Sequence, residues 1–569
     1  MLKRAISIGI ENYKEMISRK YYYVDKTLMI KELLDRQGKV NLFMRPRRFG
    51  KTLTLSMMRT FFERDMDETG RTADNRGYFE GMKIMEAGEA YTGKLGRYPV
   101  IDLSLKSAKQ PEYGMAYDCI RDEIIKEYQR HRYVLDGAVL LDLQKEKYLA
   151  IMNERAEAAA YAKSLAFLSE CLRAYHNENV IVLIDEYDVP LENAYFCGFY
   201  DEMVGFIRSL FESALKTNDN LEFAVITGCL RISRESIFTG LNNLKIVSIL
   251  NESYAEYFGF TQSEVEGMLG YYELSGMTDD VKKWYDGYLF GDTEVYNPWS
   301  ILNYVDEMRQ GDTRYPRPYW SNTSSNSIIR ELVENAQIGV RREIEDLISG
   351  GQIEKPIHED ITYEDVLRTQ DNLWNFLFFT GYLKKVSQRF EDDTLYLTLA
   401  IPNMEIRYIY RNTIREWFDV KMKQTERAPL YKALLAGDSE TFEILLKKLL
   451  LGSISYYDSA EKFYHGFLLG VLSGMDAYYP QSNRESGDGR PDILLTPVDE
   501  QQPVIIFELK KADSPIDMDT KCDEALRQIE EKRYDAELLA EGYLKILKYG
   551  ICFCKKSCRV KICRKEETL

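Results

Sequence analysis

One short segment near the N-terminus combines the residue types that bind phosphate groups: Arg45-Pro46-Arg47-Arg48-Phe49-Gly50-Lys51-Thr52. Its second half is the Gly-Lys-Thr of a phosphate-binding loop, whose usual form is G-x-x-x-x-G-K-[ST]. In such a loop we expect Lys51 to reach the β- and γ-phosphates of a nucleotide and the Thr52 hydroxyl to bind Mg²⁺. The first half is unusual, because Arg45 stands where the loop normally begins with glycine, and arginine adopts a positive φ only with strain.

The segment predicts a set of nucleotide-binding residues: Arg45, Arg47, Arg48, Phe49, Gly50, Lys51 and Thr52. The arginines leave two alternatives open. Their guanidinium groups either contact phosphate in place of the glycine backbone, or face the next domain or bound DNA. A helix start that merely contains Gly-Lys-Thr is the alternative without any phosphate chemistry.

An apolar stretch that ends in two acids supplies the other half of the predicted nucleotide site. Val180–Ile184 is followed directly by Asp185 and Glu186. At the end of a buried parallel strand, such acids lie on the sheet edge where ligands bind. Asp185 is expected to help hold Mg²⁺, and Glu186 to activate the attacking water. The alternative is a strand that simply ends in polar turn residues.

A third strand, Glu222–Gly228, ends in a polar side chain, Thr227, and is followed by Arg231 and Arg234. A polar group at the tip of a neighbouring strand can sense the γ-phosphate, and Arg231 can stabilise its developing charge. A turn with solvated arginines explains the same residues equally well.

A second set of chemistry-bearing residues lies near the C-terminus. Asp492 opens one expected strand, and Glu508 and Lys510 close the next, where a spacing of two places both on one face. If the strands form a hairpin, Asp492 and Glu508 converge and can share a Mg²⁺ ion that activates water against a phosphodiester. Lys510 would position the water. Gln528 on the following helix can join the pocket, and Glu461 on the preceding helix can be a further acidic ligand. A hairpin with charged ends is the alternative.

A frame of alternating strands and helices is expected to bring the N-terminal residues together. The patterns predict strands at Lys39–Met44, Tyr98–Leu105, Asn179–Ile184, Glu222–Gly228 and Lys245–Leu250, with helices at Thr52–Phe62, Tyr113–Arg132 and Glu154–Tyr175. Continuous apolar strands separated by helices indicate a parallel sheet covered on both faces. The predicted fold class is therefore α/β.

The chain is predicted to contain three domains: residues 1–253 with the phosphate loop, a mostly helical middle region at 254–428, and a second α/β domain at 429–569. The middle region carries no chemistry that its residues identify. In the last domain the patterns predict the order helix, strand, strand, helix, strand. The last of these strands, Leu544–Cys552, overlaps a predicted strand pair over Ile546–Cys563, with its turn at Lys555-Lys556-Ser557.

The composition, 45% hydrophobic and 29% charged residues, is that of a soluble globular protein. A net charge of −16 argues against non-specific coating of nucleic acid, although it leaves room for a local basic groove. No apolar run approaches the roughly 18 residues that span a bilayer. Nine scattered cysteines fit a reducing compartment. We therefore expect a cytoplasmic location and no membrane partner.

Two parts of the chain resemble known families. Residues 1–290, with Tyr23-Val24-Asp25-Lys26-Thr27 ahead of the arginine-rich loop, resemble the bacterial AAA-ATPase-like family, in which that loop is the usual form. Residues 435–569 resemble the PD-(D/E)XK nuclease superfamily through four motifs: Phe463-Tyr464-His465-Gly466, Gly489-Arg490-Pro491-Asp492, Glu508-Leu509-Lys510 and Ala525-Leu526-Arg527-Gln528-Ile529. The resemblance implies a P-loop NTPase core, a C-terminal restriction-endonuclease-like domain, and Asp492, Glu508 and Lys510 as the nuclease centre.

The predicted nucleotide site and nuclease site indicate ATP and Mg²⁺ as cofactors. They indicate nucleic acid as the partner, DNA rather than RNA. A homo-oligomer or a protein partner is a further option. One functional hypothesis is an ATP-hydrolysing core that controls a nuclease. Another is a nucleotide-dependent switch whose C-terminal domain binds nucleic acid or a protein without cleaving it. A third keeps the nuclease but lets the loop bind nucleotide without turnover.

Overall fold

The computed structural model describes most of the chain: residues 3–66, 71–216, 218–230, 237–238, 241–311, 315–322, 338–359, 370–412, 427–453, 461–472, 474–475, 477–482, 489–499 and 501–564. It forms two compact units. Unit 1 comprises Met1–Ile328 and Gly350–Tyr410, and unit 2 comprises Ile329–Ser349 and Arg411–Leu569. The domain boundary predicted after residue 253 lies inside unit 1, and the one predicted after residue 428 lies inside unit 2.

Unit 1 is built on a five-stranded sheet in the order β2-β3-β4-β1-β5, in which all neighbouring strands are parallel. Its strands are β1 Val40–Met44, β2 Val100–Ser104, β3 Val180–Asp185, β4 Leu221–Gly228 and β5 Leu244–Val247. Every residue of β1 and β3 is buried, as expected for strands covered on both faces. The α/β prediction is confirmed, and each of the five predicted strands is present.

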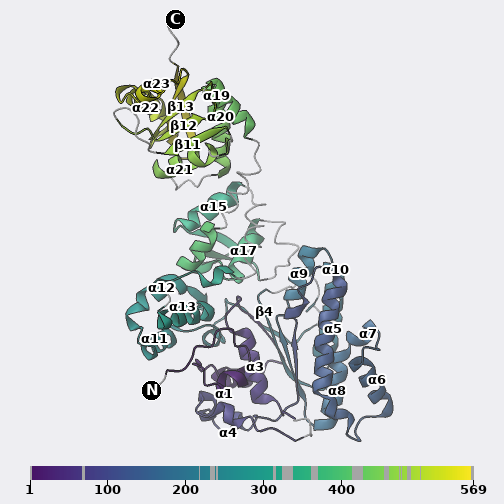
Figure 1. The fold of residues 1–569 in the computed structure, drawn as a ribbon. Coiled ribbons are helices and arrows are strands. Elements are labelled where there is room, and N and C mark those ends of the chain that lie inside the picture. Colours follow the sequence, from purple (N-terminus) through teal and green to yellow (C-terminus); the bar gives the residue numbers. More distant parts are fainter. Residues whose placement is uncertain are drawn as a thin grey trace. The chain divides into compact units, whose positions relative to one another are not determined.

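Helices cover both faces of this sheet (Figure 1). One face carries α1 Tyr13–Ser18 and α3 Lys51–Phe62, and the other carries α5 Tyr113–Arg130, α8 Ser164–His176 and α10 Tyr200–Leu215. Shorter helices complete this part of the unit: α2 Leu28–Arg36, α4 Glu89–Thr92, α6 Asp142–Met152, α7 Ala158–Tyr161 and α9 Val189–Cys197. The helices on the second face pack on one another as well as on the sheet.

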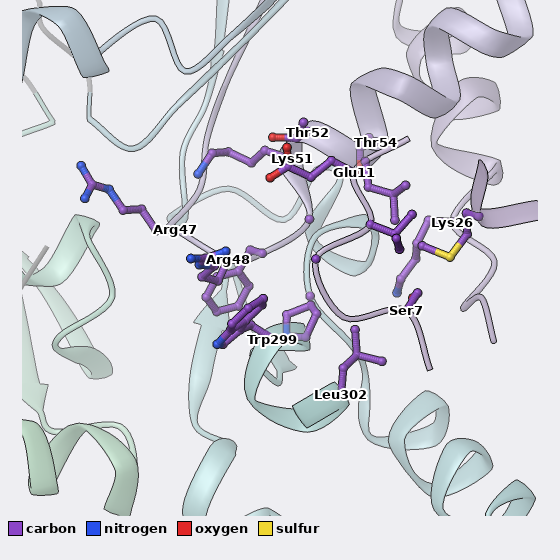
Figure 2. Close-up of a pocket in the computed structure, with 18 of the residues that line it drawn as sticks. Ser7, Glu11, Lys26, Arg47, Arg48, Lys51, Thr52, Thr54, Trp299 and Leu302 are labelled. Carbon is purple, nitrogen blue, oxygen red and sulfur yellow. The ribbon is translucent and has the colours of Figure 1, made fainter. Parts of the chain in front are cut away.

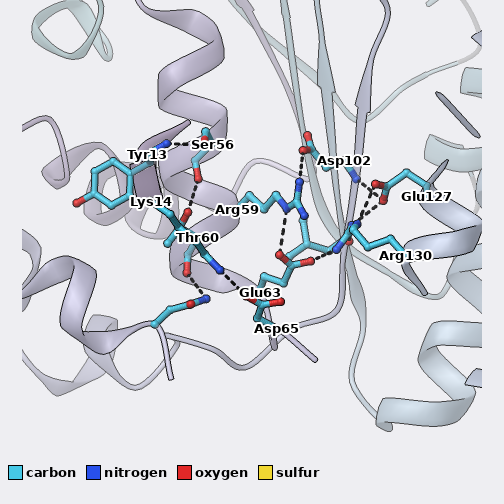
Figure 3. A network of polar contacts seen from close by, with 12 residues as sticks. Tyr13, Lys14, Ser56, Arg59, Thr60, Glu63, Asp65, Asp102, Glu127 and Arg130 are labelled. Atoms are coloured by element: carbon cyan, nitrogen blue, oxygen red, sulfur yellow. Dashed lines mark hydrogen bonds and ion pairs between the residues drawn. The ribbon is translucent and has the colours of Figure 1, made fainter. Parts of the chain in front are cut away.

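A partly buried network of charges joins the two helical layers through β2 (Figure 3). Arg59 on α3 pairs with Glu63 at 3.0 Å and with Asp102 on β2 at 2.9 Å. Arg130 on α5 pairs with Glu127 at 2.6 Å and also with Glu63. Because each carboxylate has an arginine partner, the desolvation of the acids is compensated within the network.

The rest of unit 1 is helical but also contains β-structure that the sequence did not predict. The helices are α11 Gln262–Tyr271, α12 Thr278–Tyr285, α13 Pro298–Gln310 and α17 Gln370–Phe379. The strands are the pair β6 Tyr288–Phe290 and β7 Thr293–Val295, and the antiparallel sheet β8-β10-β9 formed by β8 Ile353–Ile357, β9 Lys384–Glu391 and β10 Thr394–Ala400. The prediction of a mostly helical region is therefore incomplete.

Unit 2 contains a five-stranded mixed sheet in the order β11-β12-β13-β14-β15, in which only β13 and β14 are parallel neighbours. Its strands are β11 Tyr478–Ser482, β12 Ile493–Pro497, β13 Val504–Lys511, β14 Ile546–Cys554 and β15 Ser557–Arg564. Its helices are α15 Ile338–Ile348, α19 Ala428–Ala436, α20 Ser439–Ser453, α21 Glu461–Leu472, α22 Met518–Glu531 and α23 Ala536–Ala540. The predicted β12–β13 and β14–β15 hairpins are both present.

The two faces of this sheet pack against different helices, so β13 divides its side chains between them. Phe507 and Leu509 join the core with α19, α20 and α21, whereas Ile506 joins the core beneath α22 and α23. Glu508 and Lys510 therefore project from the α22 face. Among the described residues of both units, no helix has the length and apolarity that a membrane crossing requires.

Candidate active sites

The phosphate loop joins β1 to α3 through a tight turn that ends at a left-handed glycine. Gly50 has φ 82° and precedes α3 as its N-cap residue, without a capping side chain. The first N–H groups of a helix have no partner inside the helix, so those of α3 remain available to an anion. A Cβ atom added at Gly50 would meet nothing within 4 Å. The loop backbone therefore faces open space that fits a phosphate group.

Lys51 lies beneath this loop and bonds its backbone. Its Nζ donates to the main-chain oxygens of Arg45 at 2.9 Å and Pro46 at 3.0 Å. The side chain is buried, so its charge is held by carbonyl dipoles rather than by water. A phosphate oxygen is a stronger acceptor than a carbonyl. The ammonium group is therefore placed to transfer its bonds to a bound phosphate.

Hydroxyl groups from two other elements orient the acid of β3. The Asp185 carboxylate accepts a hydrogen bond from Thr52 Oγ1 at 2.6 Å and another from Thr227 Oγ1. Thr227 reaches it because β4 pairs in parallel with β3, with Ile184 opposite Ile226. This brings together three of the predicted site residues. Their oxygens match the preference of Mg²⁺ for hard ligands, so the set fits that ion.

Glu186 follows Asp185 in a left-handed conformation with φ 52° and lines the pocket beside the loop. Among the described residues no group donates a hydrogen bond to its carboxylate. Burial raises its pKa, and the nearby carboxylates of Asp185 and Asp188 raise it further against the opposing charge of Lys51. A carboxylate with a raised pKa and a free oxygen has the properties of a general base for water.

Arg45 does not line the pocket. Its guanidinium is fully buried and donates to the main-chain oxygens of Met44 at 2.9 Å, Val247 at 3.1 Å and Ser253 at 3.4 Å. It also lies over the ring of Phe290, with 4.9 Å to the centroid. Burial lowers its pKa to about 9. The Arg45 side chain is thus separated from the other residues of the loop that were predicted to bind nucleotide, and it has a role in the core of unit 1.

The other loop residues predicted to bind nucleotide do line the pocket, and they contact partners from later in the chain. Arg47 pairs with Glu192 at 2.6 Å. Arg48, with φ 70°, lies over the ring of Trp299 at 4.2 Å from the centroid. Phe49 is buried against Tyr288, with 5.1 Å between ring centroids. Arg48 and Phe49 therefore pack on the region after residue 253, whereas the partner of Arg47 lies before it. Whether the arginines also contact phosphate stays a prediction.

Asp188, to which the sequence assigned no role, organises the turn after β4. Its Oδ2 accepts the N–H groups of Cys229 at 2.7 Å and Leu230 at 3.1 Å. Gly228 allows this approach, because a Cβ there would lie 2.9 Å from Asp188 Oδ1. Arg231, the next residue along the chain, lies outside the described residues, so its predicted role stays a prediction.

The resulting pocket has a volume of about 450 Å³, which suits a small-molecule ligand (Figure 2). Figure 2 shows Lys51 and Thr52 in the upper part of the view and Trp299 and Leu302 in the lower part. Lys106 and Lys109, which follow β2, also line the pocket and were missed in the sequence. Their place just after a strand of a parallel sheet is the signal that indicates them, since ligands bind at that edge.

The second site lies on the α22 face of the unit 2 sheet and joins four of the predicted residues. Lys510 Nζ donates to Glu508 Oε1 at 3.0 Å and to Gln528 Oε1 at 2.7 Å. Asp492 Oδ2 accepts the main-chain N–H of Leu509 at 2.8 Å, which fixes the carboxylate at the start of β12 beside β13. The predicted convergence of Asp492 and Glu508 is thus present in the structure.

The electrostatics of this site fit a divalent cation. Glu508 Oε2 is buried and has no hydrogen-bond partner among the described residues. Burial, with repulsion from Asp492, raises the pKa of the Glu508 carboxyl to about 7. If Mg²⁺ bound here, the unpaired Glu508 oxygen would coordinate it, and the positive ion would offset the repulsion between the Glu508 and Asp492 carboxylates.

Two further residues support this site. His465 on α21 bonds the main-chain oxygen of Asp492 through Nε2 at 2.8 Å. The Tyr534 hydroxyl accepts from Gln528 Nε2 at 3.3 Å. Glu461 begins α21, but its side chain lies outside what the structure describes, so its predicted metal contact stays a prediction.

A parallel sheet with a phosphate loop after β1 and an acid at the end of β3, with β4 between these two strands, defines the P-loop NTPase class. The second sheet with its Asp-Glu-Lys set defines a nuclease-like domain. Residues 7–238 match the family described as a predicted AAA-ATPase, and residues 459–562 match the PD-(D/E)XK nuclease superfamily. These matches confirm the two-part architecture that the motifs predict.

A curated relative extends the similarity over the whole chain. It is described as an uncharacterized protein in the vnfD 5' region of Azotobacter chroococcum mcd 1, and it is 25% identical over 567 residues, which covers 95% of each chain.

Proposed function

We propose that unit 1 binds and hydrolyses ATP and thereby controls Mg²⁺-dependent cleavage of DNA phosphodiesters by unit 2, in the cytoplasm. The observation that carries the proposal is the presence of two assembled sets of side chains in one chain. Lys51 and Thr52 line one pocket, and the Asp185 carboxylate accepts a hydrogen bond from Thr52. Glu508 and Lys510 meet beside Asp492 on a separate sheet.

In the nucleotide site each residue has a distinct task. Lys51 would exchange its loop carbonyls for the β- and γ-phosphate oxygens. Thr52 and Asp185 would hold Mg²⁺, which neutralises phosphate charge when bound. Glu186 would orient the attacking water and accept its proton, a task that its raised pKa favours. Thr227 keeps the Asp185 carboxylate turned toward Thr52.

In the nuclease site Asp492 and Glu508 would hold Mg²⁺, which lowers the pKa of bound water and so supplies a nucleophile. Lys510 orients that water and balances charge near the phosphate, while Gln528 fixes the position of the lysine ammonium. His465 anchors the backbone of Asp492. The site thus has one residue for each function that phosphodiester hydrolysis requires.

Cleavage of plasmid and linear DNA by the full chain with Mg²⁺, with and without ATP, tests the proposal. We expect Asp492→Ala to abolish strand breaks and Asp513→Ala, which removes an exposed aspartate three residues after Lys510, to leave them unchanged. An inactive wild type, or equal cleavage by Asp492→Ala, would refute the proposal that unit 2 is a nuclease.

Phosphate release tests the ATPase half. Glu186→Gln is expected to bind ATP but to release phosphate at least about 100-fold more slowly, since it removes the general base. Glu202→Gln, which removes an exposed acid of α10, should release phosphate at the wild-type rate. If the wild type binds ATP and releases no phosphate, the loop is a sensor and hydrolysis is excluded.

The strongly acidic net charge of −16 favours a second candidate function. In this alternative, unit 2 binds nucleic acid or a protein without cutting, and ATP shifts a conformational equilibrium. It predicts ATP-sensitive retention of DNA without metal-dependent strand breaks, so the cleavage experiment separates the two candidates.

A further inference from the structure

The unit 1 pocket continues well beyond the phosphate-binding groups into a second, apolar half. This half is lined by residues from four separate segments: Ile10, Tyr22, Val24, Phe260, Trp299 and Leu302. A triphosphate needs only the charged end around Lys51 and Thr52. The apolar half therefore has room and chemistry for another part of the ligand that the phosphates belong to.

The apolar half presents aromatic surface that is held in place. The Trp299 indole N–H donates to the main-chain oxygen of Tyr319 at 3.3 Å, which fixes the ring plane. Arg48 of the phosphate loop lies over the same ring, so the aromatic surface is continuous with the phosphate end (Figure 2). A flat, polar-edged ring that stacks on aromatic faces is the group that such a wall suits.

Another wall of the pocket comes from the segment Tyr22–Lys26, whose motif the two proposed activities do not explain. Lys26 Nζ donates to both carboxylate oxygens of Glu264, at 2.7 and 2.5 Å, and to the main-chain oxygen of Glu256 at 2.6 Å. Three acceptors use the three protons of the ammonium group. Lys26 therefore ties this segment to the start of α11 rather than offering its charge to a ligand.

A second tie holds the other end of the segment. Asp25 accepts the main-chain N–H of Thr27 at 2.9 Å and that of Lys83 at 2.7 Å. Tyr22 donates its N–H to the main-chain oxygen of Ala5 at 2.9 Å. Contacts on both sides of Val24 thus hold the wall in place before a ligand binds. Such preorganisation is what a selective binding site requires.

We propose that the apolar half of the pocket binds the purine base of the nucleoside triphosphate, and that the Lys26–Glu264 pair is a positioning element that holds the wall of this base site. The inference rests on the proposed nucleotide-binding function of the same pocket. It assigns Trp299 as a base-contacting residue and gives the Tyr23–Thr27 motif a physical role.

Comparison of ATP with inorganic tripolyphosphate, which lacks the base, tests the proposal on the full chain in the presence of Mg²⁺. Trp299→Ala is expected to weaken ATP binding by about tenfold or more, the size of a lost base stack, and to leave tripolyphosphate binding within about twofold. Trp299→Phe should restore most of the ATP affinity. Trp284→Ala, a partly buried tryptophan of α12 outside the pocket, should change neither affinity.

Lys26→Met tests the positioning element with the same two probes, and unchanged tripolyphosphate binding reports that the variant is folded. ATP affinity should fall about tenfold while tripolyphosphate affinity is kept. Wild-type ATP affinity in Trp299→Ala, or a parallel loss of both probes in Trp299→Ala and Lys26→Met, would overturn the base site alone. A wild type that binds neither probe would overturn the proposed nucleotide function, and this inference with it.

Discussion

At the scale of single residues, the arginine-rich loop combines two kinds of arginine. Arg45 is enclosed by backbone carbonyls and aromatic rings, whereas Arg47 and Arg48 border the pocket. The position that is glycine in the general phosphate loop is thus used here to attach the loop to the end of β5. Arginine at this position lacks the backbone freedom of glycine, but the contacts of its side chain fix the position of the loop.

Replacing Arg45 should therefore destabilise unit 1. In Arg45→Met the carbonyls of Val247 and Ser253 lose their donor while remaining largely buried, a loss of roughly 1–3 kcal/mol in the free energy of unfolding. Urea unfolding of the full chain, followed by hydrogen exchange of the β1 amides, measures it. Arg19→Met, which changes an exposed arginine, is the matched control. An unchanged stability of Arg45→Met would contradict the structural role.

The raised pKa of Glu508 predicts a pH-dependent metal site. In the metal-free protein the carboxyl titrates near pH 7, so below that pH a proton occupies the oxygens that Mg²⁺ needs. Near pH 6 binding should release about one proton and weaken roughly tenfold per further pH unit, whereas near pH 8.5 it should release almost none.

Calorimetric titration of the full chain with Mg²⁺ in two buffers of different ionisation enthalpy counts the released protons directly. The Glu508→Gln chain should bind Mg²⁺ weakly, and it should no longer release the proton that leaves Glu508 in the wild type. Identical proton counts at the two pH values in the wild type would show that Glu508 is not a ligand.

At the scale of elements, the close packing of α22 on the sheet depends on one glycine. Gly550 of β14 is paired with Glu508, and a Cβ there would lie 2.6 Å from the main-chain oxygen of Cys522 on α22. Any side chain must push α22, and with it Gln528, away from Lys510. The glycine thus sets the distance between the helix and the site.

Gly550→Ala should cost roughly 1–3 kcal/mol through overpacking and should lower DNA cleavage as Gln528 is displaced. Gly466→Ala is a matched control, because a Cβ at that exposed position of α21 meets nothing within 4 Å. There alanine should stabilise the helix by up to about 1 kcal/mol. Hydrogen exchange of the β14 amides compares the two variants, and equal protection would refute the role of Gly550.

The elements also show what the sequence can predict. Strands β1 and β3 are continuous apolar runs with acids or a phosphate loop at their ends, so their type and their chemistry were both visible. Strand β9 was missed because it is largely exposed and charged, as in an edge strand with few packing residues. Its two-residue turn, Asp392-Asp393 with φ 45° and 63°, was the available signal for a hairpin.

The contacts of individual side chains depended on distant residues and were less predictable. Asp492, Glu508, Lys510 and Gln528 could be assembled from strand order and a period of two. Arg45 bonds residues about 200 positions later in the chain, and no local sequence pattern predicts these contacts. The Trp299 contact with Arg48 is equally remote in the chain.

At the scale of the whole molecule, each unit contains a complete candidate site with its own core, and the described structure of each explains its site without the other. The relative from Azotobacter chroococcum aligns with both units in the same order. Control of one site by the other can therefore be expressed as a coupling free energy between the two sites, which thermodynamic linkage allows to be measured.

If ATP controls unit 2 through DNA binding, it changes the affinity of unit 2 for DNA, and DNA must then change the affinity of unit 1 for ATP by the same factor. We expect a factor of about 5 to 150, the usual range of such coupling. Both affinities can be measured on the Asp492→Ala chain, which keeps the DNA intact, with a non-hydrolysable ATP analogue. Lys51→Met in the same background should abolish the effect of nucleotide on DNA binding while leaving DNA binding without nucleotide unchanged. Two factors that are both near one would refute control through DNA binding, whereas unequal factors would mean that the measurements had not reached equilibrium.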